Sequence, residues 1–420
     1  MKPVLALLLC VILAACSDSA VMSPTVTPPF NAQVSYCAGV EPLWVAFQDG
    51  DGAWTRALPS TSNGNTVFQF SFSSNRGAIA TVTDGGLGLT DLNVLYGTPS
   101  ELESVGITSP RYCSPAVSKT LLGTVAGLGS NDIAFVRAGF ASQAFVIPAS
   151  GPDFALQVLP PGPRDILATR RTRINGDEFL TGIILRRSID LPDGATLPVF
   201  DFGSLEPFAP SVANLSLQGP GVDGAFTTTR LRSSNMDAEV GGGATPAGGG
   251  PYYALPEARL LAGDLQVLTA STSGASPEGA RSATVYFRAP TDRTLVLGAG
   301  LVPPVFATVA TTPSLRLRAQ FTEQSDYNRE TGIAYQEGAT TIVAVSMTPA
   351  YATRSGAGYD LVIPELGQVP GFNPAWALQA GQALRWSAVR IGGTLGLGVD
   401  PVPSVGDTRS AAVRGDVITP

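Results

Sequence analysis

The sequence predicts an all-β protein made of tandem β-sandwich-like domains with few short helices. Short runs of alternating apolar and polar residues recur along the chain, and this two-residue period is typical of strands that bury one face. The 47 glycines and 34 prolines separate these runs, as expected for the turns between strands. Hydrophobic residues form 44% of the 420 residues, which favours a folded chain over a disordered one.

Residues 1–15 have the features of a signal peptide. Lys2 precedes an apolar run from Val4 to Leu13, which leads into Leu13-Ala14-Ala15-Cys16. This pattern resembles the lipobox of bacterial lipoproteins, and the resemblance implies a mature chain that begins at an acylated Cys16. The apolar run is shorter than the ~20 residues that span a bilayer as a helix.

The expected location is therefore outside the cytoplasm, with the chain held at a membrane by its lipid anchor. The residue after the cysteine is Ser17. In enterobacterial sorting an aspartate at that position favours retention in the inner membrane. The serine therefore favours the outer membrane.

Charge and composition exclude several function classes. The formal net charge of −7 disfavours binding to nucleic acid. The chain contains no histidine, which removes imidazole metal ligands, the Ser-His-Asp triad and the Cys-His pair. We expect neither a cofactor nor a metal site, and we assign no residue a catalytic role.

The first folded unit is predicted after a tether. Residues 16–31 are rich in serine, threonine and proline and suit an extended linker, and an N-terminal β domain is expected at 32–115. Within it Phe68, Phe70 and Phe72 alternate with polar residues, the pattern of a half-buried strand.

A disulfide is expected to close this domain. Cys10 is lost with the signal peptide and Cys16 carries the lipid, so Cys37 and Cys113 remain. An even pair in an oxidising compartment favours a Cys37–Cys113 bridge, with two separate buried thiols as the alternative. On the chain-entropy model such a bridge contributes roughly 4 kcal/mol.

Two local signals stand out in the same domain. The alternating run 43–47 is followed by Asp49-Gly50-Asp51-Gly52, which predicts a hairpin. Thr98-Pro99-Ser100-Glu101 combines an N-cap residue, a proline at the first helical position and a glutamate three residues after the cap. This capping box predicts a short helix to about Val105.

A second domain is predicted at 116–210, where four motifs follow one another. They are Gly123-Thr124-Val125 in an opening strand, Ile133 to Val136, the run from Phe154 to Gly162, and Asp165-Ile166-Leu167-Ala168. Over 119–168 this order resembles the carboxypeptidase regulatory-like, prealbumin-like β-sandwich family. The resemblance implies a structural or ligand-presenting sandwich without catalytic residues.

The remainder is expected to form a C-terminal β-rich domain at 211–398. Leu315 to Phe321 alternates, and Thr340 to Met347 is a nearly continuous apolar run suited to a central strand. The glycine-rich stretch 241–250 predicts either a domain boundary or a long hairpin. Residues 399–420 are expected to form a flexible tail.

Five arginines form a candidate anion-binding patch, because a hairpin would bring them together. They are Arg170, Arg171, Arg173, Arg186 and Arg187. Guanidinium groups bind carboxylates and phosphates, so an acidic glycan or a lipid headgroup is the expected ligand. The alternative is a salt-bridged exposed face, since four acids lie nearby in sequence: Asp165, Asp177, Glu178 and Asp190.

Two tryptophans, Trp44 and Trp376, are candidates for stacking on sugar rings. Trp44 lies on the opposite face of its predicted strand from Val45 and Phe47, so its alternative is a place in a sandwich core.

These features predict a membrane-anchored envelope lipoprotein with a non-enzymatic interaction, adhesion or structural role. The expected partner is a glycan or another envelope protein. The alternative is a polysaccharide-binding or carboxylate-dependent polysaccharide-active surface lipoprotein, in which two carboxylates perform acid/base work. No spacing among the 33 acidic residues singles out such a pair.

Overall fold

The structure is a computed structural model. It describes residues 30–36, 41–62, 64–105, 119–140, 142–158, 162–272, 279–355, 358–395 and 402–420. Strands dominate and the two α-helices are short, so the all-β prediction is confirmed. Cys16, Cys37 and Cys113 lie outside the described residues, and their lipidation and disulfide remain predictions.

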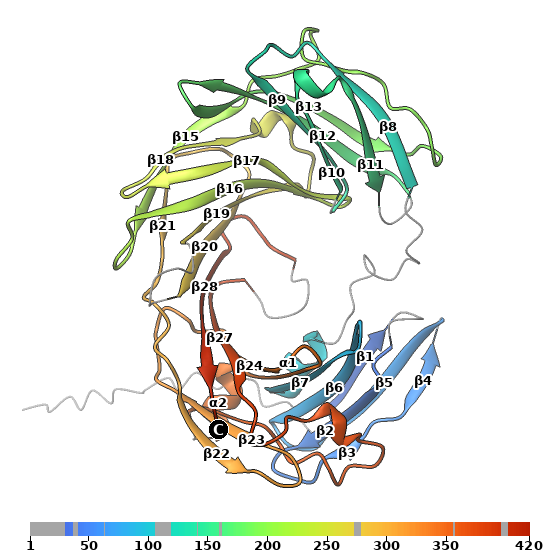
Figure 1. Cartoon of the computed structure of the whole chain (residues 1–420), viewed down its shortest axis with the longest axis vertical. Coiled ribbons are helices and arrows are strands. Elements are labelled where there is room, and N and C mark those ends of the chain that lie inside the picture. Colours follow the sequence, from blue (N-terminus) through green and yellow to red (C-terminus); the bar gives the residue numbers. More distant parts are fainter. Residues whose placement is uncertain are drawn as a thin grey trace, which may run out of the picture.

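One twelve-stranded sheet, which we call the long sheet, runs through most of the molecule. In spatial order its strands are β17 (Met236–Pro246), β16 (Gly224–Ser233), β19 (Leu265–Ser271), β20 (Ala280–Phe287), β28 (Thr408–Ile418), β27 (Leu384–Gly393), β24 (Glu330–Glu337), β25 (Thr341–Met347), β7 (Leu89–Gly97), β6 (Gly77–Gly86), β2 (Trp44–Asp49) and β3 (Thr55–Arg56). Figure 1 shows this sheet curving along a crescent, from β17 at one end to β3 at the other. The strand pairs are antiparallel except β25 with β7, which is parallel.

Two smaller sheets cover opposite faces of the long sheet at the end that contains β2, β6 and β7. One contains β1 (Phe30–Tyr36), β5 (Asn65–Phe72) and β4 (Pro59–Ser62), and the other contains β22 (Val305–Ala310), β23 (Arg316–Phe321) and β26 (Tyr359–Val362). Phe68, Phe70 and Phe72 of β5 are buried against β2 and β6, as their alternation predicted. The result is a three-layer arrangement with a core on each side of β2, β6 and β7.

A third small sheet covers the other end. It consists of β18 (Gly250–Ala254), β15 (Ser211–Gln218) and β21 (Arg293–Val296), which pack on β19 and β20 through Leu215, Tyr252 and Leu268. The glycine-rich stretch 241–250 lies in the second strand of the long β16–β17 hairpin and in the turn to β18. The hairpin alternative is therefore the one that the structure shows.

Residues 119–201 form a β-sandwich at one end of the crescent (Figure 1). One sheet contains β10 (Ser142–Val146), β9 (Asp132–Ala138), β12 (Arg164–Ile174) and β13 (Asp177–Ile189). The other contains β11 (Asp153–Val158), β8 (Lys119–Ala126) and β14 (Phe200–Asp201). Val136, Leu156, Ile166 and Phe200 lie in the shared core. The motifs that resemble the carboxypeptidase regulatory-like family lie in this sandwich, and the resemblance itself remains a prediction.

The helices are short and lie at the ends of strands. They are α1 (Pro99–Val105), α2 (Pro349–Ser355) and the 3-10 turns η2 (Pro148–Ser150), η3 (Glu257–Arg259) and η4 (Pro374–Trp376). The capping box before α1 is confirmed, because the Thr98 amide and hydroxyl both donate to Glu101 Oε2 at 2.8 Å. No helix in the described part of the chain is long and apolar enough to cross a membrane.

The C-terminal segment differs from its prediction. A flexible tail was expected from Val399, but residues 408–418 form β28, which pairs with β20 on one side and with β27 on the other. The strand lies between β27, which precedes it in the chain, and β20, which is distant in sequence, and local composition does not reveal these pairings. The flexible-tail prediction is wrong for these residues.

The predicted division into domains also differs from the sheet topology. β7 belongs to the expected 32–115 domain, yet it pairs along its length with β25 of the expected 211–398 domain. Buried residues from both regions, including Leu92 and Val343, share one core. These two parts of the chain therefore build one continuous structure, because β7 and β25 pair with each other and bury one face in a shared core.

Candidate functional site

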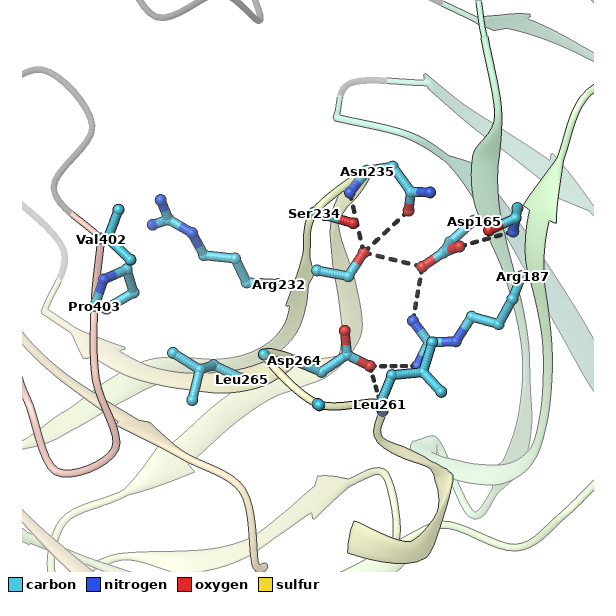
Figure 2. A pocket seen from close by; sticks show the side chains of 14 residues that line it. Asp165, Arg187, Arg232, Ser234, Asn235, Leu261, Asp264, Leu265, Val402 and Pro403 are labelled. Carbon is cyan, nitrogen blue, oxygen red and sulfur yellow. Dashed lines mark hydrogen bonds and ion pairs between the residues drawn. The ribbon is translucent and has the colours of Figure 1, made fainter.

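A polar cavity lies where the sandwich meets the long sheet. Its volume is about 280 Å³, and Figure 2 shows its walls. The sandwich contributes β12 and β13, while the long sheet contributes the β16–β17 turn and the loop that precedes β19. Val402 and Pro403 approach from the C-terminal segment. We call this cavity the junction pocket.

Arg187 of β13 joins the two sides of the junction pocket. Its Nη1 donates to Asp165 Oδ2 at 2.7 Å, and its Nη2 donates to Asp264 Oδ2 at 2.6 Å (Figure 2). The two carboxylate side chains are only 4% and 5% exposed. The same Nη2 also donates to the carbonyl of Arg259 at 3.2 Å. One guanidinium therefore ties the sandwich to the loop before β19 through charge-assisted hydrogen bonds.

Asp165 accepts several further hydrogen bonds. The backbone amide of Ser188 donates to Oδ1 at 3.0 Å, and the Ser233 hydroxyl donates to Oδ2 at 2.9 Å. With its amide nitrogen turned toward Asp165, Asn235 donates to both carboxylate oxygens at 3.0 and 2.9 Å. Each oxygen of this buried carboxylate is thus satisfied by neighbours on β13 and on the β16–β17 turn.

The backbone of Ser188 is strained at this point. Its φ is +52°, which is uncommon for a residue with a side chain. The β12–β13 register also shifts between Arg164 and Ile166, so this is a bulge in the hairpin. The bulge turns the Ser188 amide toward Asp165 and places Arg187 beside both carboxylates.

The remaining lining combines polar groups with small apolar surfaces. Arg232 extends from β16 toward Val402 and Pro403 in Figure 2, while Leu261 and Leu265 line the floor beside Asp264. The pocket contains two carboxylates and two guanidiniums, so its charges balance. Hydroxyls, an amide and backbone groups beside apolar carbon form a lining that suits a polar, uncharged ligand.

Three of the five predicted patch arginines lie on β12 and are held by the protein's own groups. Arg171 is paired with Glu239 of β17, and Arg173 is paired with Glu178 at 2.8 Å. Arg170 donates to the Thr181 hydroxyl at 3.1 Å. Arg137, which the sequence did not single out, shares Glu239 with Arg171 and is buried.

The other two patch arginines lie on β13 and contact different carboxylates. Arg186 donates to both oxygens of Glu206 at 2.7 and 2.8 Å and lies over the Phe200 ring. Arg187 enters the junction pocket instead. The hairpin thus brings the arginines onto neighbouring strands but distributes them among carboxylates, which favours the alternative of a salt-bridged face.

Trp44 is a core residue. It is 2% exposed, its indole N–H donates to the Pro370 carbonyl at 3.2 Å, and its ring packs edge-on against Phe372. The core alternative is therefore confirmed for Trp44, and it excludes Trp44 as a sugar-stacking platform, because the three-layer arrangement covers both faces of β2. Trp376 is partly buried in η4 and lies 6.5 Å from Trp44, measured between ring centroids.

Sequence reasoning found some residues of the junction pocket and missed others. Arg187 and Asp165 were both singled out, and the structure pairs them. Asp264, Ser233 and Asn235 were not, since they lie 68 or more positions from their partners in the chain. The turn-forming Ser233-Ser234-Asn235 was the one local signal for this part of the pocket.

Comparison with known proteins adds no relative. No protein-family model matches the chain, and no curated protein matches it.

Proposed function

We propose that this chain is an envelope lipoprotein, anchored through Cys16 at the outer membrane, whose folded part has a non-enzymatic interaction role. The sequence supports the anchor through the lipobox-like Leu13-Ala14-Ala15-Cys16. The junction pocket supports the interaction role. The observation that carries this role is the hydrogen bonding of its two buried carboxylates to one arginine.

Acid/base catalysis needs a carboxyl group that gains and loses a proton during the reaction. In the junction pocket, one shared guanidinium donates to Asp165 Oδ2 and to Asp264 Oδ2, and the Leu261 amide also donates to Asp264 Oδ2 at 2.8 Å. Breaking these bonds for a catalytic step leaves buried charge unpaired, which is costly. The arrangement suits a preformed wall against which a ligand binds.

The ligand class that fits this wall is a saccharide, which is our second candidate function. A saccharide offers many hydroxyls that both donate and accept, and the pocket offers hydroxyl, amide and guanidinium groups in return. Leu261, Leu265 and Val402 supply apolar surface for the carbon face of a sugar ring. A glycan partner at the cell surface is consistent with the proposed location.

The anchor is tested by mass spectrometry of the mature N-terminus. We expect an acylated cysteine at position 16 and partition of the protein into detergent. The variant Cys16→Ala is expected to lose both. An unmodified chain that begins at Met1 contradicts the anchor.

The interaction role is tested on a glycan array combined with analysis of reaction products. We expect binding without hydrolysis, and we expect Ser234→Phe to abolish it because an exposed serine at the pocket is replaced by a ring that fills it. Ser71→Phe, on an exposed site of β5, is the matched control and is expected to bind normally. Hydrolysis that is lost in Asp264→Asn contradicts the non-enzymatic role, and equal binding by both phenylalanine variants excludes the junction pocket as the site.

A further inference from the structure

A second cavity, separate from the junction pocket, lies at the other end of the crescent. Its volume is about 410 Å³. The end of β23, the connection between β23 and β24, the helix α2 and the start of β26 surround it. Its lining includes Phe321, Glu323, Tyr327, Tyr359 and Arg390. We call it the Arg390 pocket.

Arg390 is the unusual group in this cavity. It lies on β27 and is 0% exposed, yet it forms no ion pair within the described part of the chain. Its Nε donates to the Thr331 hydroxyl at 3.1 Å, and its Nη1 donates to the Thr322 carbonyl at 2.6 Å. Its Nη2 has no hydrogen-bond partner among the described residues. A buried guanidinium with an open donor lacks the compensation that buried charges ordinarily have.

The neighbouring Tyr359 and the charge of Glu323 favour the charged guanidinium, but burial outweighs them. Its central carbon lies 4.7 Å from the ring centroid of Tyr359, a cation–π contact that fixes its orientation. Tyr327 is turned away, since its hydroxyl donates to the Ala299 carbonyl at 2.6 Å. Burial lowers the pKa of Arg390, but an arginine in a protein retains its proton.

Arg281 offers an internal comparison. It is also buried, at 3% exposed, and it also lacks an ion pair in the described residues. However, both terminal nitrogens of its guanidinium have partners. Nη1 donates to the carbonyls of Pro220 and Gly298, and Nη2 donates to the carbonyl of Gly221. Only its Nε is without a partner. Arg390 differs because its open donor is at the forked end and the residue lines a cavity.

The rest of the lining defines the ligand that would complete this site. Phe321, Pro349 and Ala352 provide an apolar wall. Glu323 is exposed and also lines the cavity, so its negative charge opposes a ligand with several negative charges. A ligand with one carboxylate and an apolar body satisfies both conditions.

We propose that the Arg390 pocket binds a small monocarboxylate, whose carboxylate pairs with the guanidinium of Arg390 while its apolar part packs against Phe321 and Ala352. This site is independent of the proposed function at the junction pocket.

Titration of the full chain with benzoate tests the proposal, by calorimetry and by thermal unfolding. We expect saturable binding and a raised melting temperature with benzoate, and neither with the uncharged analogue benzamide. Inorganic phosphate is the third probe, and we expect it to bind more weakly because Glu323 repels its second charge. Equal effects of benzoate and benzamide, tighter binding of phosphate, or no saturable benzoate binding would overturn the proposal.

Three variants locate the site. Arg390→Lys is expected to weaken benzoate binding at least about tenfold, because the lysine side chain is shorter, lacks the forked guanidinium and does not reach the same position. Thr353→Trp changes an exposed residue of α2 at the cavity, so it tests the site without disturbing the buried arginine. We expect it to block binding, and we expect Glu323→Gln to strengthen it. The control is Arg385→Gln, an exposed arginine on the same strand, which is expected to bind like wild type. Unchanged benzoate affinity in Thr353→Trp would contradict the location.

Discussion

Arg281 and Arg390 lie on the two strands that flank β28, and both pair in register with the same residue, Ala412. All three residues are buried, and Ala412 is 0% exposed. The two guanidiniums extend from either side of this alanine into the layer between the long sheet and the small sheets that cover it, where they donate to backbone carbonyls. The small side chain at 412 leaves room for both of them.

We therefore predict that Ala412→Leu destabilises the fold. A larger side chain between two buried arginines has no space to occupy, and overpacking of this kind costs about 1–3 kcal/mol. Val413 is the control, because it lies on the opposite face of β28 and is 38% exposed. We expect Val413→Leu to change the free energy of unfolding by less than about 0.5 kcal/mol, measured by urea denaturation. Equal effects of the two changes would contradict the assigned faces.

The sequence predicted local features of this fold well and distant pairings poorly. The capping box at Thr98 and Glu101 and the alternation of Phe68, Phe70 and Phe72 depend on residues a few positions apart, so the pattern was visible. The position of β28 depends on partners from residues 280–285 and 384–393. Such pairings are set by tertiary contacts, and no local periodicity in the sequence predicts them.

The candidate site shows the same division. The hairpin that carries Arg171 and Arg187 was predictable, as was the nearby Asp165. The partners that decide the roles of these arginines, Glu239 and Asp264, come from strands and loops far along the chain. Sequence reasoning therefore found the charged groups but not their pairing.

A second prediction compares two arginines of the β12–β13 hairpin. We expect Arg187→Ala to destabilise the protein by about 3–5 kcal/mol, because it leaves the buried carboxylates of Asp165 and Asp264 without their shared partner. Arg173→Ala breaks a pair in which the arginine side chain is 59% exposed, and we expect a loss of about 0–1 kcal/mol. Chemical denaturation of both variants measures the difference. A similar loss for both would mean that the Arg187 contacts do not connect the sandwich to the long sheet in solution.

A third prediction concerns Glu101, which links the starts of both α-helices. Its Oε2 accepts from the hydroxyl of Thr98 before α1 and from the hydroxyl of Thr348 before α2, each at 2.8 Å. We expect Glu101→Ala to cost about 1–2 kcal/mol, the size of a lost helix cap. In a double-mutant cycle with Thr348→Val the two losses should be less than additive, since both remove the same contact. Full additivity would show that the two residues do not interact.

The fourth prediction concerns pH and the half-buried Glu330 of β24. Burial raises the pKa of this carboxyl above its ordinary value of 4.5, although Ser346 and the charge of Arg409 act in the opposite direction. A raised pKa means that the folded state prefers the protonated form. The resulting stability is complete below pH 4.5, the ordinary value, and is lost as the pH rises through the raised pKa of the folded protein.

Glu330→Gln removes this effect because the amide does not ionise. We expect the variant to be more stable than wild type at neutral pH, and we expect the difference to shrink as the pH falls toward the ordinary glutamate value. Glu206→Gln is the contrast, since the hydrogen bond from Arg186 lowers the pKa of Glu206. Its stabilising contribution exists above the ordinary pKa and is lost as the pH falls, so this variant should be less stable than wild type at neutral pH. Urea unfolding across a pH series measures both, and a destabilised Glu330→Gln at neutral pH would show that burial does not dominate at Glu330.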